Sequence, residues 1–301
     1  FTIYIQSLLL LVILIVHLIS LFYLKYQKTN NYEYCIILQY ATLFLFFLTE
    51  SFNFMTFVIS LIGTSIMVYT LLAIEIKDHG KEAALKYYFL SALTSGLLFY
   101  GLFLLLSIYN TLDFNILNWM LWSSLSMVHN WNPFLIEQFL LLNAGCIILI
   151  VIGTLFKLGA FPSHLWTIDI YEGSSNPVMS FFLMPMKLAI FAMFAKIINY
   201  PLNALHWVWE LIIWFASLMS LLWGCLGAVT EQTIKKFVGY SSINQMGYLL
   251  IGLNLVFLEG YGSTILYLTI YMMMNIILLS ILFSIKKTLT NERVLTLLDL
   301  N

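Results

Sequence analysis

The sequence predicts an all-α membrane protein that crosses the bilayer about nine times. Of its 301 residues, 62% are hydrophobic and only 9% are charged, whereas soluble domains carry about 25% charged residues. Apolar runs of about 20 residues, long enough to cross ~30 Å of hydrocarbon as helices, recur along the whole chain. No hydrophilic domain interrupts them, so residues 1–301 are expected to form a single membrane domain.

Nine spans follow from these runs. They cover residues 2–24, 35–50, 54–74, 84–108, 136–159, 176–198, 205–228, 237–256 and 262–285. The longest connection, residues 109–133, is rich in Trp and Asn. It is expected at the membrane interface, where indole rings are favoured.

The basic residues give this layout an independent test, because inner loops of membrane proteins carry an excess of Lys and Arg. If the spans alternate in direction, one side receives almost nothing beyond Lys196. The other side receives Lys25, Lys28, Lys77, Lys81, Lys235, Lys236, Lys286, Lys287 and Arg293. This asymmetry predicts an outer amino terminus and an inner carboxyl terminus.

Composition also excludes several functions. The net charge of −1 comes without a basic patch, which argues against a nucleic-acid partner. Cys35, Cys146 and Cys225 are far apart and lack CxxC spacing, so they are predicted to be buried free thiols. There is no nucleophile–base pair, phosphate-binding glycine loop or Cys/His cluster for a redox centre. The chain is therefore expected to hold no cofactor and no metal.

Two lysines stand inside apolar spans, Lys157 near the end of one and Lys187 near the middle of another. A lysine at the bilayer centre costs ~2.5–3.5 kcal/mol on insertion scales, so such residues usually serve ion or proton pathways. Loss of water disfavours the charged amine, which can then exchange protons near neutral pH. Lys187 is expected to face the protein interior. For Lys157, snorkelling toward water is the alternative.

A helix break is predicted directly after Lys157, because Pro162 lacks a backbone donor. Broken helices occur in membranes where they are buried in protein or line a wet cavity. His164 follows the break and titrates near neutrality, so it is a candidate to pass a proton toward Lys157. Asp169 and Glu172 are expected in a polar turn, where they cap the next helix.

Several stretches together carry a resemblance to a known family. They are 156–166 (FKLGAFPSHLW) with 169–173 and 187–191, then 82–88 (EAALKYY) with 95–96, and finally 232–236 leading into 239–243 and 247–250. Over roughly residues 50–300, the sequence resembles the subunit 2 family of respiratory complex I, the antiporter-like membrane subunits of NADH:ubiquinone oxidoreductase. The Tyr-Ser-Ser run at 240–242 is shared with related cation/proton antiporters.

By this resemblance, Lys157 matches the lysine of the family's broken seventh helix, Lys187 its eighth-helix lysine, and His164 the histidine after the break. The family moves protons through such lysines, so Lys157, Lys187 and His164 are the proton-relay candidates of this chain. Further candidates for relay or for proton uptake on the inner side are Lys235, Lys236, Glu75 and Glu50. The family's inverted repeats imply leading helices at 1–50, a first repeat core at 54–198 and an incomplete second repeat at 205–301. The expected fold is thus truncated at both ends, and a separate chain is expected to supply the missing carboxyl-terminal helices.

One departure concerns the partner of Lys157. The family places a glutamate on its fifth helix, and aligning residues 53–69 with that helix puts Ile62 at its position. We therefore expect no carboxylate of this chain within salt-bridge distance of Lys157.

Three functions stay open at this point. The first is a proton-translocating subunit of complex I, with NADH, FMN, iron–sulfur clusters and ubiquinone held by other subunits. The second is a cation/proton antiporter subunit, and the third is a structural membrane-arm subunit that has lost pumping. Other membrane-arm subunits and lipids such as cardiolipin are the expected partners. The bias toward residues with A+T-rich codons (Phe, Ile, Leu, Tyr and Asn) indicates an organelle-encoded gene and the mitochondrial inner membrane.

Overall fold

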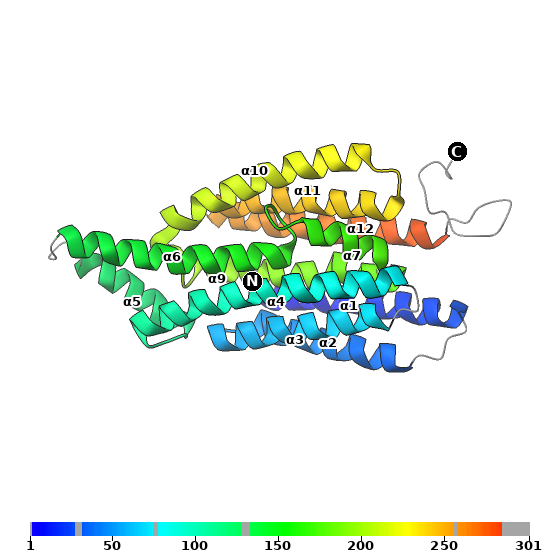
Figure 1. The fold of residues 1–301 in the computed structure, drawn as a ribbon, viewed down its shortest axis with the longest axis horizontal. Coiled ribbons are helices and arrows are strands. Elements are labelled where there is room, and N and C mark those ends of the chain that lie inside the picture. The colour runs from blue at the N-terminus through cyan, green and yellow to red at the C-terminus, as the bar shows by residue number, and fades with distance from the viewer. Residues whose placement is uncertain (1, 28–31, 75–77, 128–132, 256–257, 285–301) are drawn as a thin grey trace.

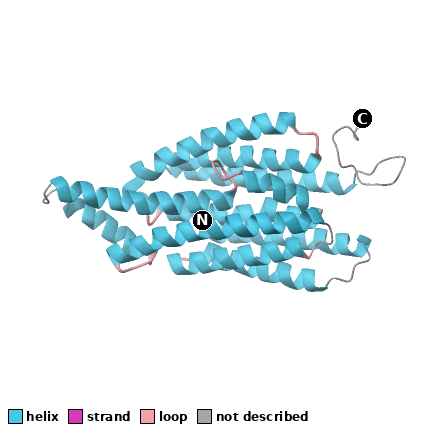
Figure 2. Ribbon diagram, in the orientation of Figure 1, coloured by secondary structure: helices cyan, strands magenta, loops and turns pink. Residues whose placement is uncertain are grey.

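The computed structural model describes residues 2–27, 32–74, 78–127, 133–255 and 258–284, and these form a bundle of helices (Figures 1 and 2). Eight long helices are α1 (Thr2–Gln27), α2 (Tyr32–Glu50), α3 (Phe54–Ala73), α4 (Asp78–Tyr109), α6 (Pro133–Leu158), α10 (His206–Thr230), α11 (Ile234–Asn254) and α12 (Leu258–Ser284). A ninth span joins α8 (Asn176–Phe181), the π-helical segment η2 (Phe182–Met186) and α9 (Lys187–Asn199).

Each of the nine predicted spans corresponds to one of these helical segments, so the all-α membrane fold is confirmed. Judged by length and hydropathy alone, eight of them could cross a membrane. The helix left out is α11. It carries Lys235 and Lys236 in its first turn and several hydroxyl and amide side chains further along, which lower its mean hydropathy.

The connection at 109–133 is more ordered than the sequence predicts. It contains a 14-residue helix, α5 (Phe114–Met127). Two of its tryptophans, Trp119 and Trp122, are exposed, while Trp131 lies outside the described residues. The start of α5 is tied to the start of α3, because Asn53 and Asp113 pair through an isolated bridge and a 2.7 Å side-chain hydrogen bond.

The span that contains Lys187 lies at the centre of the bundle. Within Asn176–Asn199 every residue is buried except Asn176, Lys196 and Asn199, which are partly buried, whereas each of the other candidate spans exposes a large part of its surface. The surrounding helices run side by side, with the ends of α1 and α3 and the α10–α11 connection at one end of the bundle (Figure 1). The α2–α3 and α4–α5 connections lie at the other end. The bundle thus surrounds the span that contains Lys187 with other helices.

The predicted break after Lys157 is confirmed. Helix α6 ends at Leu158, Gly159 adopts a positive φ of 71°, and the chain restarts as the short helix α7 (Leu165–Gly173). A Cβ at Gly159 would clash with Cγ2 of Thr167, so only glycine fits this turn without strain. The indole of Trp166 donates to the carbonyl of Phe156 at 3.0 Å, which fixes α7 against the end of α6.

The three cysteines are free thiols. Cys146 is buried, as expected, and Cys35 is partly buried. The expectation was wrong for Cys225, which is exposed on α10. An outward-facing apolar side chain is ordinary on a helix that borders lipid, where burial in protein is not needed to remove it from water.

Candidate functional site

Lys157 lies in the last turn of α6 and points into the protein, with only 3% of its surface exposed. Its Nζ donates a 2.8 Å hydrogen bond to the hydroxyl of Ser65 on α3. It also lies 5.7 Å from the centre of the Tyr87 ring on α4. Since the ammonium group is buried among three helices, snorkelling toward water does not describe this lysine.

No carboxylate among the described residues forms an ion pair with Lys157. The ion pairs found there join Lys86 to Glu82 and Asp169, and Lys236 to Glu172. The expectation is therefore confirmed for this part of the chain. Glu75 lies outside it. Ser65, one turn after Ile62, is the α3 residue that contacts Lys157, and its own hydroxyl donates to the carbonyl of Leu61 at 2.7 Å.

Ser65 was not predicted from the sequence, because the alignment with the family placed the expected partner of Lys157 at position 62. Ile62 is only partly buried, whereas Ser65 is 5% exposed. The available signal was a group of small polar residues inside an apolar span, namely Ser60, Thr64 and Ser65, all of which are buried.

Lys187 begins α9 and is likewise 3% exposed, so its predicted interior position is confirmed. Its Nζ makes no hydrogen bond to the described residues and lies 5.8 Å from the centre of the Tyr171 ring on α7. The π-helical segment just before it contains Pro185. Proline supplies no backbone N–H, and wide turns of this kind often mark functional positions in helices.

Aromatic rings fill the space between the two lysines. Phe182 meets the Tyr87 ring edge-on at 5.9 Å and the Tyr171 ring at 6.2 Å. Trp166 lies against Tyr87 at 5.2 Å and against Phe182 at 6.3 Å. Each lysine thus faces one tyrosine, and Phe182 lies between the two tyrosines.

His164 is buried at the start of α7, with 5% exposed. Its ring stacks on Phe161 at 5.7 Å and lies 5.9 Å from the Trp223 ring of α10. Its Nδ1 has no hydrogen-bond partner among the described residues. The ring contacts of His164 are with Phe161 in the break and with Trp223 of α10, its backbone carbonyl accepts from Thr167 of α7, and no contact found for it among the described residues reaches Lys157.

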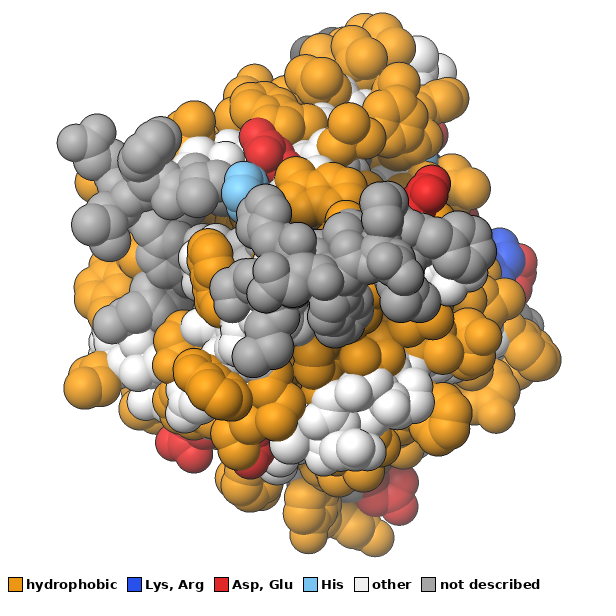
Figure 3. Space-filling model, turned by 90° about the vertical axis from the view of Figure 1, so that its left-hand side faces the viewer, with side chains coloured by type: hydrophobic (Ala, Val, Ile, Leu, Met, Phe, Trp, Pro, Cys, Tyr) orange, Lys and Arg blue, Asp and Glu red, His pale blue; other side chains and the backbone are white. Residues whose placement is uncertain are grey.

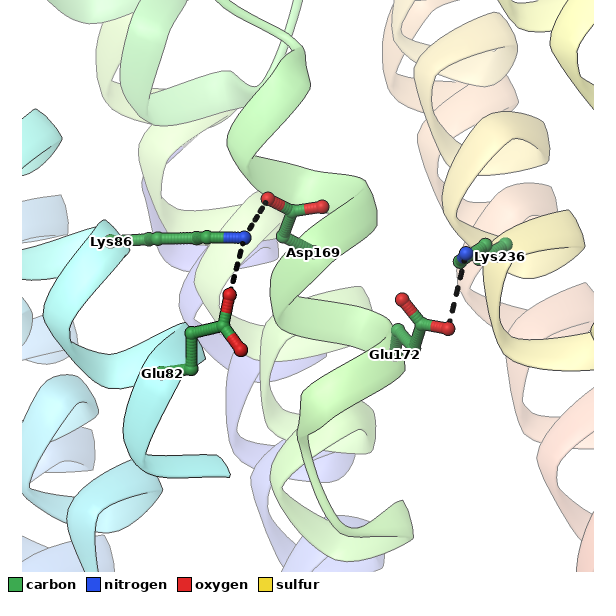
Figure 4. A network of polar contacts seen from close by, with 5 residues as sticks. All are labelled: Glu82, Lys86, Asp169, Glu172 and Lys236. Carbon is green, nitrogen blue, oxygen red and sulfur yellow. Dashed lines mark hydrogen bonds and ion pairs between the residues drawn. The ribbon is translucent and has the colours of Figure 1, made fainter. Parts of the chain in front are cut away.

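Asp169 and Glu172 do not cap the next helix, so that expectation was wrong. Both lie on α7 and pair with lysines of two other helices (Figure 4). Asp169 binds Lys86 of α4 at 3.0 Å, and Glu172 binds Lys236 of α11 at 3.1 Å. The sequence did not reveal these pairs because the partners are 83 and 64 residues away along the chain.

The remaining candidates contribute polar contacts at the two ends of the bundle. Lys235 donates to the carbonyl of Ser174, just after α7, so it acts together with Lys236 in holding that helix. Glu50, at the end of α2, accepts a 3.3 Å hydrogen bond from Gln6. In the described part of the chain, no three His, Cys, Asp or Glu side chains gather closely enough to hold a metal ion.

Comparison with known proteins assigns this arrangement to a family. The pattern of the NADH:quinone oxidoreductase/Mrp antiporter transmembrane family matches residues 51–299. The chain belongs to this family. Among its relatives, NADH-quinone oxidoreductase subunit N of Pelagibacter ubique is 34% identical over 271 residues, covering 89% of this chain and 54% of the relative. Subunit N of Granulibacter bethesdensis is 32% identical over 258 residues, covering 85% and 52%.

Solved structures agree with the fold of the family. Respiratory complex I from Thermus thermophilus contains a chain that matches with a TM-score of 0.71 and 25% identity, covering 92% of this chain and 56% of that one. A chain of an archaeal membrane-bound sulfane sulfur reductase shares the fold, with a TM-score of 0.75 at 20% identity, and the match covers 92% and 54%. The chain thus spans about half the length of the curated relatives that it matches.

Proposed function

We propose that this chain is a membrane-arm subunit of respiratory complex I, corresponding to subunit 2, and takes part in proton translocation driven by NADH oxidation and ubiquinone reduction. The observation that carries the proposal is the pair of buried lysines, Lys157 and Lys187, on either side of a broken helix. The names of the bacterial relatives support the same assignment.

The chemistry of the site follows from burial. An ammonium group taken out of water is disfavoured relative to the neutral amine, so a small change in its surroundings can move a proton on or off. The Ser65 hydroxyl supports the charged form of Lys157 with one hydrogen bond, which is weaker support than an adjacent carboxylate. No ion pair among the described residues adds to this support for the charged form of Lys157.

The proposal places the chain in the mitochondrial inner membrane, with its amino terminus toward the intermembrane space and its carboxyl terminus in the matrix. The end of the bundle that bears α5 shows hydrophobic and scattered acidic side chains, and few basic ones, among the described residues (Figure 3). This distribution supports an outer position for that end under the positive-inside rule. The division into a first and a second repeat stays a prediction.

Other subunits would hold the cofactors of the complex, namely FMN, iron–sulfur clusters and the sites for NADH and ubiquinone. Membrane-arm subunits and lipids such as cardiolipin would surround the chain. The expectation that a separate polypeptide supplies further helices also stays a prediction. A cation/proton antiporter subunit is the second candidate function, because the matching family includes the Mrp antiporters.

Purification of the native assembly tests the proposal. An affinity tag on this chain, followed by mild solubilisation and mass spectrometry, is expected to recover redox subunits together with NADH:ubiquinone activity. Recovery of other antiporter-like chains without flavin or iron would favour the second candidate. The same preparation shows whether a separate chain of this family contacts α12.

A further inference from the structure

Tyr171 is a buried polar residue next to Lys187, and the site formed by the two lysines gives it no role of its own. It lies on α7 with 1% of its surface exposed, and its ring faces the Nζ of Lys187 at 5.8 Å. The ring also packs on Gly239 of α11, where even a Cβ would approach its Cδ2 to 3.2 Å. The close approach of α11 keeps this side chain in place.

The helices around Tyr171 carry further buried polar side chains. Ser242, which is 1% exposed, lies one turn after Gly239 on α11. Tyr271 and Asn275 lie one turn apart on α12 and are 3% and 6% exposed. Helix α11 packs against both α7 and α12, and α12 also meets the segment that precedes Lys187, so buried polar side chains gather on neighbouring helices in a region otherwise lined by apolar residues.

Three polar atoms of this group are buried without a hydrogen bond to the described residues. They are Nζ of Lys187, the hydroxyl of Tyr271 and Nδ2 of Asn275. A buried polar group left unsatisfied is costly, and buried polar groups in native proteins are normally completed by internal water. The three groups lie on α12 and at the start of α9, and α12 packs against α11 and against the segment that precedes Lys187, which favours one hydrated polar route over three unrelated defects.

Two ion pairs hold the helix that carries Tyr171. Asp169 and Glu172 stand on either side of it in the sequence, and they bind Lys86 of α4 and Lys236 of α11 (Figure 4). Lys235 adds a hydrogen bond to the carbonyl that follows α7. The short helix is thereby fixed between two parts of the bundle, which sets the position of its buried tyrosine.

We propose that Tyr171 is a relay residue that passes protons between Lys187 and the polar side chains of α11 and α12. The ammonium of Lys187 gives a proton, through a bridging water, to the hydroxyl oxygen of Tyr171. The original hydroxyl proton leaves at the same time toward Ser242 or Tyr271. One O–H bond forms as another breaks, so the phenol stays neutral throughout. This inference rests on the proposed function and assigns it a further residue.

The test compares variants of Tyr171 in the assembled complex, reconstituted into vesicles and supplied with NADH and ubiquinone. Tyr171→Phe keeps the ring and removes only the hydroxyl, whereas Tyr171→Leu also removes the packing. Loss of a positioned proton-transfer group slows the step by about 10²-fold or more. Tyr171→Phe is therefore expected to lower proton translocation per assembled complex as far as Lys187→Met does. A purely structural role would leave Tyr171→Phe near the wild-type rate and impair only Tyr171→Leu.

Two further variants separate the possible failures. Tyr109→Phe removes a buried hydroxyl that bonds Asn143 at 3.0 Å, in another part of the bundle, and is expected to leave the translocation rate unchanged. Ser242→Ala combined with Tyr271→Phe removes both hydroxyls toward which the Tyr171 proton leaves, and this double variant carries the test if Tyr171→Phe fails to assemble. If Lys187→Met is inactive, wild-type translocation by Tyr171→Phe overturns the relay role. If Tyr171→Phe does not assemble, wild-type translocation by the double variant overturns it. Wild-type translocation by Lys187→Met as well would instead remove the proposed function.

Discussion

Lys157 on α6 and Ser65 on α3 are joined by a 2.8 Å hydrogen bond inside the bundle. A hydroxyl thus supports the buried amine where an ion pair would be the stronger arrangement. The bond links two helices whose interacting residues are 92 positions apart, so it also fixes the end of α6 against α3 just before the break.

The first prediction concerns this bond. Ser65→Ala leaves the buried amine of Lys157 without its protein partner, and an unsatisfied buried donor costs about 1–3 kcal/mol. Thermal unfolding of the purified assembly should therefore begin at a lower temperature. Ser60→Ala is the matched control, because the Ser60 hydroxyl donates only to Phe57 of its own helix. Equal stability of the two variants would contradict the role given to Ser65.

The turn after α6 gives a second prediction. Gly159→Ala forces a side chain into a positive φ and a clash with Thr167, and such strain costs about 1–3 kcal/mol. Gly145→Ala, inside α6, meets no atom within 4 Å and is expected to be neutral or slightly stabilising. Limited proteolysis and unfolding temperature distinguish the two variants, and a harmless Gly159→Ala would speak against a fixed break.

Packing between the lysines is tested by Phe182. Its ring is 2% exposed and touches both tyrosines, and Phe→Ala in a packed interior typically costs about 3–5 kcal/mol. Phe103→Ala, at a position 65% exposed on α4, should cost much less. Denaturant or thermal unfolding in detergent measures the difference, and similar losses in both variants would show that Phe182 is not tightly packed.

The ion pair between Glu172 and Lys236 is expected to contribute modestly. Their side chains are 46% and 28% exposed, so a double-mutant cycle with Glu172→Gln and Lys236→Gln should give a coupling of about 0.2–1 kcal/mol. High salt should reduce it, since exposed charges are screened. A coupling that is absent at low salt would remove this pair from the elements that hold α7.

The helices were largely predictable because their signal is local. A run of about 20 apolar residues is sufficient to identify a membrane span, and Pro162 marked the break through its missing N–H. Helix α5 was missed because its Trp, Asn and Ser residues give neither a long apolar run nor a clear boundary. Composition could not separate a short interfacial helix from a loop.

The site was predictable only in part, for a different reason. An intramembrane lysine is conspicuous in sequence, so Lys157 and Lys187 could be named. Which side chain of α3 meets Lys157 depends on how the two helices rotate and approach each other, and this is set by packing along their whole length. The same holds for the partners of Asp169 and Glu172, which come from helices distant in the sequence.

The central claim is that Lys157 and Lys187 carry protons, and the most direct measurement is the initial rate of NADH-driven proton translocation by the assembled complex in sealed vesicles. Lys157→Met and Lys187→Met remove the titratable amine and put an unbranched apolar side chain of similar length in its place. Lys25→Met makes the same change at an exposed lysine of α1. The rate is predicted to fall about 10²-fold or more in each of the two buried variants and to stay at the wild-type value in Lys25→Met. Wild-type translocation in either buried variant, with normal assembly, would contradict the role proposed for that lysine.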